Sequence, residues 1–188
     1  EFENKEIGFK WELAPRLMLT GALFQLDRKN QYVADGPFAG QQVGATRTEG
    51  GEVALTGHLT DRWQVSAAFG HQIAEIVEGR PSDIGHEVPW VPHNTFSLWN
   101  KYQFTDMFAA GLGVVHKTDF FAALDNSVTV PGYTRLDAAL YLDLNETWSA
   151  QLNVENLLNE DYFVAAHNNN NISPGAPTTV YVTVGAKF

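Results

Sequence analysis

The chain has 188 residues, no cysteine, and 22 acidic against 12 basic side chains, which gives a formal net charge of −10. A charge this negative argues against nucleic acid as a partner, because phosphate binding needs a basic surface. The lack of cysteine excludes disulfides and thiolate sites within the chain, and no run of about 18 apolar residues could form a membrane-spanning helix.

Alternation of apolar and polar residues predicts about nine β-strands, because side chains point to opposite faces along a strand. For the predicted strand at 16–32, it stays open which face is the apolar one, because Leu17, Leu19 and Leu23 on one face compete with Ala22, Phe24 and Leu26 on the other. Most of the segments are longer than the roughly 5–6 residues usual in soluble sheets. The predicted strands lie at 6–13, 16–32, 44–60, 63–70, 94–104, 108–114, 135–144, 148–155 and 178–188.

The connections between these strands alternate strictly in length. Short turns are predicted at 14–16, 60–62, 105–107 and 145–147, and long loops at 34–43, 78–93, 118–131 and 160–177. In an antiparallel meander, alternate connections lie at the same end of the sheet. Short turns on one side and long loops on the other are typical of outer-membrane barrels.

Aromatic residues flank the aliphatic centre of the strands, as the two interfaces of a bilayer require. Glu52, Lys101, Asp137 and Glu155 fall on the opposite, polar faces. The pattern therefore favours an all-β transmembrane antiparallel barrel over a soluble β-domain, whose oily face would lie inside. The aromatics predicted near the short turns are Trp11, Trp63, Phe104, Phe108 and Trp148, and those toward the long loops are Tyr32, Phe69, Tyr133 and Phe163.

Several motifs give the chain a family resemblance. They are NVENLLNEDYF at 153–163, PGAP at 174–177 and the alternating strand that ends at Phe188, with VPHN at 91–94 and VPGY at 130–133 upstream. In order and spacing these segments resemble the barrel of TonB-dependent outer-membrane receptors, in particular the siderophore-receptor branch. The loop AHNNNNI at 166–172 is similar to that of receptors for catecholate siderophores.

The resemblance implies a 22-stranded barrel with an N-terminal plug in its lumen. Residues 1–188 would be its C-terminal portion, about nine strands. The plug, the motif that engages TonB and the first strands would be absent. The chain is thus expected to be a fragment, because nine strands cannot close and open edges in lipid leave backbone groups unpaired. The last strand would run inward, so the long loops would face the exterior of a Gram-negative outer membrane.

The implied function is active, TonB-dependent uptake of ferric siderophores. An iron-loaded catecholate is anionic and aromatic, so cationic and aromatic side chains of the long loops suit it. For any one of the aromatics, packing among the loops is the competing interpretation. The candidate ligand-binding residues are Arg80, Trp90, Phe120, Phe121 and His167.

No enzyme is predicted, since no nucleophile lies beside a base in a recognisable motif and no glycine-rich phosphate loop is present. The six histidines show no close metal-ligand spacing, so no metal or other cofactor is expected, and iron would arrive bound to its siderophore. Two alternatives remain open. One is a passive porin-like channel, which needs no plug, and the other is a soluble carbohydrate- or lipid-binding β-domain.

Overall fold

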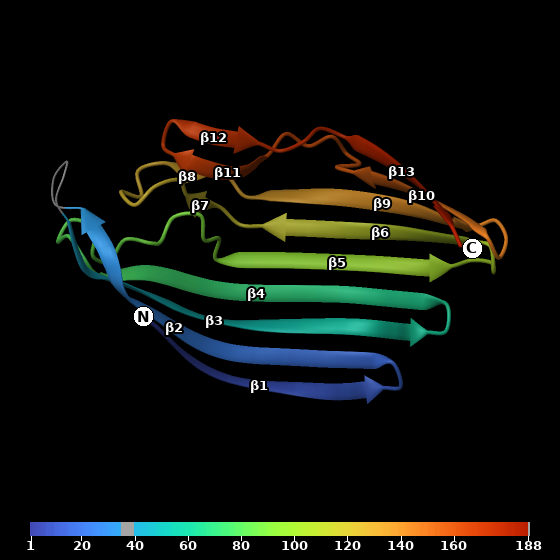
Figure 1. Cartoon of the computed structure of the whole chain (residues 1–188), viewed down its shortest axis with the longest axis horizontal. Coiled ribbons are helices and arrows are strands. Elements are labelled where there is room, and N and C mark those ends of the chain that lie inside the picture. The colour runs from blue at the N-terminus through green and yellow to red at the C-terminus, as the bar shows by residue number, and fades with distance from the viewer. Residues whose placement is uncertain (35–39, 188) are drawn as a thin grey trace.

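The computed structural model describes residues 1–34 and 40–187, and within these ranges nine long strands form one antiparallel sheet (Figure 1). The strand order is β1-β2-β3-β4-β5-β6-β9-β10-β13, so each strand of this sheet pairs with the next one of the sheet along the chain. The strands are β1 (Phe2–Ala14), β2 (Leu17–Ala34), β3 (Gly40–Thr60), β4 (Trp63–Glu78), β5 (Asn94–Gln103), β6 (Phe108–Lys117), β9 (Tyr133–Asp143), β10 (Trp148–Glu155) and β13 (Thr179–Ala186).

The nine predicted strands and the length asymmetry of their connections are confirmed. All four short turns lie at one end of the sheet and the long connections at the other (Figure 1). The loop predicted at 34–43 is wrong at its borders, because 34 belongs to β2 and 40–43 belong to β3; residues 35–39 lie outside the described residues. No helix in the described part of the chain is long and apolar enough to cross a membrane.

Two segments predicted as loops contain further strands. β7 (Phe120–Phe121) pairs with β8 (Thr129–Val130), and β11 (Phe163–Asn168) pairs with β12 (Asn171–Pro174). Periodicity needs a run of about four to eight residues to indicate a strand, so the two-residue strands β7 and β8 leave no such signal. The longer β11 reads Phe-Val-Ala-Ala-His-Asn, in which apolar and polar residues do not alternate. The long connection before β9 and the one between β10 and β13 therefore each contain a small hairpin.

The register of the strands gives the sheet one apolar face. A row of directly opposed residues runs Leu19–Leu55–Ala67–Leu98–Val114–Leu136, and another runs Ala110–Leu140–Leu152–Val182. This settles the open question in β2, because Leu19 lies opposite Leu55 and Leu17 and Leu23 share its face. Many side chains on this face are exposed, Val182 by 70% and Leu23 by 65%, so none of the described residues covers it.

The opposite face is polar and carries Glu52, Lys101, Asp137 and Glu155, as predicted. Phe24 also lies on it, across from Gly50, where a Cβ would stand only 2.9 Å from the phenyl ring. Glycine at position 50 therefore makes room for this ring and for the backbone of β4, since the same Cβ would lie closer still to the His71 carbonyl oxygen. We refer to the two sides below as the apolar face and the polar face.

The aromatic rows are confirmed only in part. Trp11, Trp63, Phe108 and Trp148 share the apolar face at the end of the sheet where the short turns lie, and Phe69 lies on it toward the long loops. Tyr133 lies toward the long loops as predicted, but it does not belong to the aromatic row of the apolar face. It pairs with Lys117 and alternates with Thr134, so it belongs to the polar face together with Arg135.

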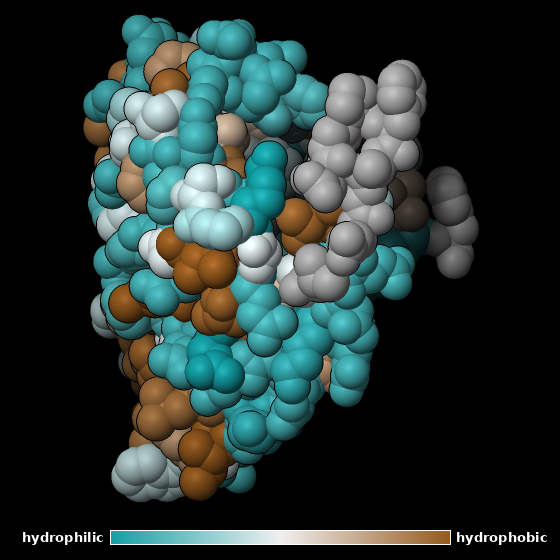
Figure 2. Space-filling model, turned by 90° about the vertical axis from the view of Figure 1, so that its left-hand side faces the viewer, coloured by the Kyte–Doolittle hydropathy of each residue, from teal (hydrophilic) through white to brown (hydrophobic). Residues whose placement is uncertain are grey.

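The hydrophobic core of the described residues lies among the long loops rather than under the sheet. Phe120, Ala122, Val130 and Ala166 are almost fully buried against one another, with Val128 and Ile172 packed around them. Viewed from the end that carries these loops, the surface is mainly hydrophilic, with hydrophobic residues gathered along its left and lower borders (Figure 2). The apolar face of the sheet is thus left for another environment to cover.

Candidate functional site

Three long connections pack into one assembly at the end of the sheet. It consists of 79–93 after β4, the β7–β8 hairpin and the β11–β12 hairpin, which we call the loop assembly. The shared core places Ala166 of β11 against Phe120 and Val130 of the other hairpin. Since this apolar cluster joins segments from two connections, the hairpins hold each other in place.

Hydrogen bonds tie the connection 79–93 to the β7–β8 hairpin. The Trp90 backbone N–H donates to the Phe121 carbonyl at 3.0 Å, and its indole Nε1 donates to the Ala122 carbonyl at 3.0 Å. Asn126 accepts from the Glu87 N–H at 2.8 Å and donates to the Glu87 carbonyl at 3.0 Å. Because these bonds reach backbone groups, they fix the path of the connection.

Asp125 joins the two hairpins through its carboxylate. Asn169 Nδ2 donates to both carboxylate oxygens, at 3.1 and 2.9 Å, and Ser127 Oγ donates at 2.9 Å. The hydrogen bond from Asn169 is the main cause that holds the pKa of Asp125 below its ordinary value, followed by the bonds from Ser127. These donors favour the charged carboxylate, so the contact depends on ionised Asp125.

We expect acid to loosen this contact. Because the folded-state pKa of Asp125 is lowered, its contribution is complete above the unfolded-state pKa of about 3.9 and is lost as the pH falls through the folded value. The rate of hydrogen exchange at 163–172, corrected for the intrinsic rates, should therefore be higher at pH 3, about one unit below the unfolded-state pKa, than at pH 5. Asp125→Asn, which mimics the protonated acid, should show the faster exchange already at pH 7. Equal protection of the wild type at both pH values would contradict this role of Asp125.

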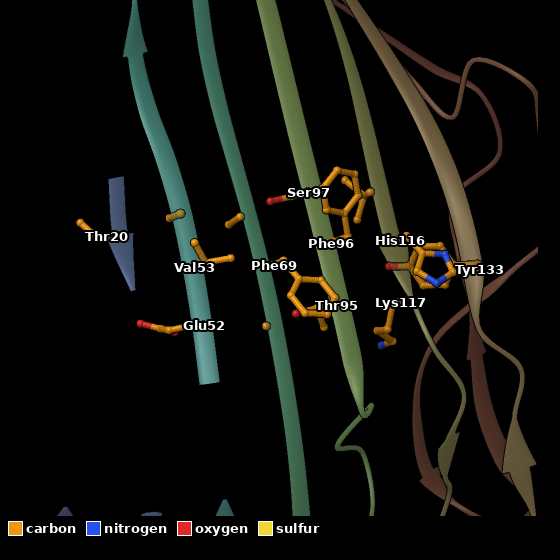
Figure 3. A pocket seen from close by; sticks show the side chains of 14 residues that line it. Thr20, Glu52, Val53, Phe69, Thr95, Phe96, Ser97, His116, Lys117 and Tyr133 are labelled. Carbon is orange, nitrogen blue, oxygen red and sulfur yellow. The ribbon is translucent and has the colours of Figure 1, made fainter. Parts of the chain in front are cut away.

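Below the loop assembly the polar face has a hollow of about 320 Å³ (Figure 3). Ala54, Ala68 and Gly70 form its floor, and a Cβ added at Gly70 would meet only Thr95 Oγ1, at 3.2 Å. Small residues on two neighbouring strands, β3 and β4, thus leave space that larger side chains would fill. Glu52 of β3 lies on one side of the hollow, and Lys117 of β6 and Tyr133 of β9 lie on the other.

Lys117 links this hollow to the loop assembly. Its Nζ donates to the Val164 carbonyl of β11 at 3.1 Å and lies 4.4 Å from the centre of the Phe120 ring and 5.7 Å from that of Tyr133. An ammonium group at these distances is attracted to the faces of the rings. Lys117 therefore contacts the wall of the sheet and both hairpins.

A second set of polar contacts anchors the far end of the loop assembly to β9. Arg135 donates to Asp137 Oδ2 at 2.8 Å and to the Tyr162 hydroxyl at 3.2 Å, and the Tyr162 ring packs 4.5 Å from Tyr133. The other oxygen of Asp137 accepts from the backbone N–H of Asn156 at 2.9 Å. Tyr162 is only 7% exposed, so this ring is part of the packing rather than of the surface.

The structure brings some of the predicted ligand-binding residues together. Trp90, Phe120 and Phe121 meet at β7, where Trp90 is 54% exposed and Phe120 only 3%. Phe120 is thus a packing residue in this arrangement, as the competing interpretation held. Arg80 pairs with Asp83 at 2.8 Å in the connection after β4, and His167 lies exposed on β11. Their contacts with a ligand remain predictions.

Sequence reasoning missed Lys117 and misplaced Tyr133. The face of each residue follows from alternation along its strand. Leu136 lies on the apolar face, so Tyr133, Arg135 and Asp137, each an odd number of residues away, lie on the polar face. Lys117 is the last residue of β6 and faces the same way as Val115, which also lines the hollow. Counting from the apolar residues of each strand would have placed both on the polar face.

Comparison with known proteins identifies the family. The family model for the TonB dependent receptor-like β-barrel matches residues 2–157. This chain belongs to the TonB-dependent receptor family. The catecholate siderophore receptor Fiu of Escherichia coli K12 is 34% identical over 98% of this chain, and the chain spans about a quarter (25%) of that relative's length.

Solved structures of TonB-dependent receptors agree with this assignment. The siderophore receptor PiuA from Acinetobacter baumannii superposes on the whole chain with a TM-score of 0.92 at 27% identity, and the chain covers 28% of it. The closed form of the ferric-catecholate import receptor Fiu from E. coli K12 gives a TM-score of 0.86 at 33% identity, over 100% of this chain and 27% of that one. TonB-dependent receptors are outer-membrane β-barrels, so the apolar face meets lipid and the polar face lines the interior.

Proposed function

We propose that the receptor containing this chain takes up ferric siderophores actively across the outer membrane, in a TonB-dependent manner. The observation that carries this proposal is the match of nearly the whole chain, loops included, to receptors named for siderophores. This chain would supply part of the barrel wall and part of the extracellular mouth. A plug and the other strands would come from the rest of the receptor.

The chemistry of the mouth supports an anionic, aromatic ligand such as a ferric catecholate. Trp90 offers a half-exposed ring at the surface of the loop assembly, and Lys117 offers a cation beside the hollow. Arg80 and His167 add further donors at the same end of the barrel. Aromatic faces and cations suit a metal complex that carries negative charge on aromatic rings. The family is one of transport receptors, and we infer that no catalytic step occurs.

Ligand titration of the full-length receptor tests the substrate class. Quenching of tryptophan fluorescence should report saturable binding of a ferric tris-catecholate, about tenfold or more tighter than of a neutral ferric tris-hydroxamate. Binding of the hydroxamate alone would overturn the catecholate assignment, and binding of neither would overturn the proposed function. A second experiment separates transport from diffusion: uptake of the labelled complex should stop in cells without TonB, whereas a porin-like channel would continue to pass it.

A further inference from the structure

Lys117 is a partly buried cation that has no acidic partner among the described residues. Arg47, Arg80 and Arg135 each form an ion pair with an aspartate, whereas in the described ranges 1–34 and 40–187 no salt bridge involves Lys117. Its ammonium group has three hydrogens, and the only hydrogen bond that it makes there is the one to the Val164 carbonyl. A half-buried cation with free donors beside an open hollow lacks the counter-charge that such a group usually has.

We propose that Lys117 is an anion-binding residue of the ligand path, and that binding there releases the β11–β12 hairpin. This inference rests on the proposed function, and it names a residue and a consequence of binding that the function does not specify. The hollow gives room for one negatively charged group, and the faces of Phe120 and Tyr133 border the same ammonium. An anionic aryl group could therefore contact the cation and the Tyr133 ring together.

The acidic residue of the hollow does not prevent this. Glu52 lies on β3 and Lys117 on β6, with β4 and β5 between them. Neighbouring strands are about 4.8 Å apart, so three steps separate the two side chains by roughly 14 Å. Thr95, directly across from Lys117 on β5, is uncharged and can donate a hydrogen bond to the same ligand. An anion at Lys117 thus meets donors on its own side of the hollow.

The coupling follows from the single bond that Lys117 makes to β11. A carboxylate or phenolate competes strongly with a neutral carbonyl for an ammonium, since charge-assisted hydrogen bonds are roughly twice as strong. When Lys117 turns toward an anion, the Val164 carbonyl loses its donor. The hairpin is then held on this side by the small cluster around Ala166 and by Asn169 on Asp125. Occupancy of the hollow should therefore increase the mobility of the hairpin.

The test uses the full-length receptor with a spin label on the hairpin. Asn170 is exposed and its side chain makes no hydrogen bond in the described structure, so Asn170→Cys provides a labelling site in a stretch without native cysteine. In the parent, a ferric tris-catecholate should raise label mobility. Lys117→Met should weaken binding of this complex about tenfold and give a mobile label without ligand. Lys117→Arg should keep both the affinity and the response.

Two controls make the outcome specific to this site. Lys101→Met removes another cation of the polar face, one that lies 4.1 Å from the Tyr141 ring and does not line the hollow, and it should change neither readout. Binding of a neutral ferric tris-hydroxamate should be insensitive to Lys117→Met. If the parent binds the catecholate and Lys117→Met binds it equally well, or if the label responds alike in both, the inference is wrong while the proposed function stands. If the parent binds no siderophore, the function itself fails.

Discussion

Asn156→Ala should destabilise the connection between β10 and β13 by about 3 kcal/mol or more. Asn156 is 1% exposed, and its side chain accepts from the Glu160 N–H and donates to the carbonyls of Glu160 and Ala176, at 2.9 to 3.0 Å. Alanine would leave these three backbone groups without partners in a buried site. It would also have to adopt the left-handed φ of 54° that asparagine tolerates.

Matched variants separate the loss of the amide hydrogen bonds from the strain that alanine has at a positive φ. Asn156→Gly removes the amide but accepts the positive φ, so it should cost less than alanine. Asn159→Ala removes another asparagine with positive φ, 53°, whose exposed side chain accepts mainly from Thr178, and it should cost about 1 kcal/mol. Urea unfolding of the receptor in lipid vesicles and hydrogen exchange at 156–178 rank the three variants by their loss of stability. An alanine variant at 156 as stable as that at 159 would show that the buried amide has no special role.

The role of Asn156 shows where the sequence stops being informative. The motif NVENLLNEDYF marks the family and the end of a strand, and both predictions are confirmed. The partner carbonyl at Ala176 lies 20 residues further along the chain. Nothing in local periodicity indicates which of several asparagines will reach it. The motif thus proves to be a structural anchor, which the fold reveals and the sequence pattern does not.

The strands themselves were predictable because their signal is local. Alternation over ten or more residues fixes which side chains share a face, and pairing with neighbours then adds little new information. The error at Tyr133 came from ordering aromatics by their position along the chain without counting parity. In the loops the rule is different, since Phe120 and Trp90 are both aromatic loop residues and only tertiary packing buries one and exposes the other.

Leu140→Arg should destabilise the receptor by about 2–4 kcal/mol in a lipid bilayer, if the residue lies near its midplane. Leu140 is on the apolar face between Ala110 of β6 and Leu152 of β10, and it is 41% exposed in the isolated chain. The surrounding row is aliphatic, so a guanidinium there has no carboxylate to pair with. Its cost is that of moving a charge from water into hydrocarbon, reduced by the reach of the side chain toward the interface.

The control is an arginine at the neighbouring position on the opposite face. Gln151 precedes Leu152 on β10, pairs with Tyr141 and lies on the polar face, so Gln151→Arg should change the free energy of unfolding by less than about 1 kcal/mol. Both variants place an arginine at one of two adjacent register positions of the paired strands β9 and β10, and the main difference is the face that receives the charge. Unfolding by urea in vesicles of one lipid composition gives the two values. A small cost at 140 together with a large one at 151 would mean that the apolar face lines the interior, and the whole assignment of inside and outside would have to be reversed.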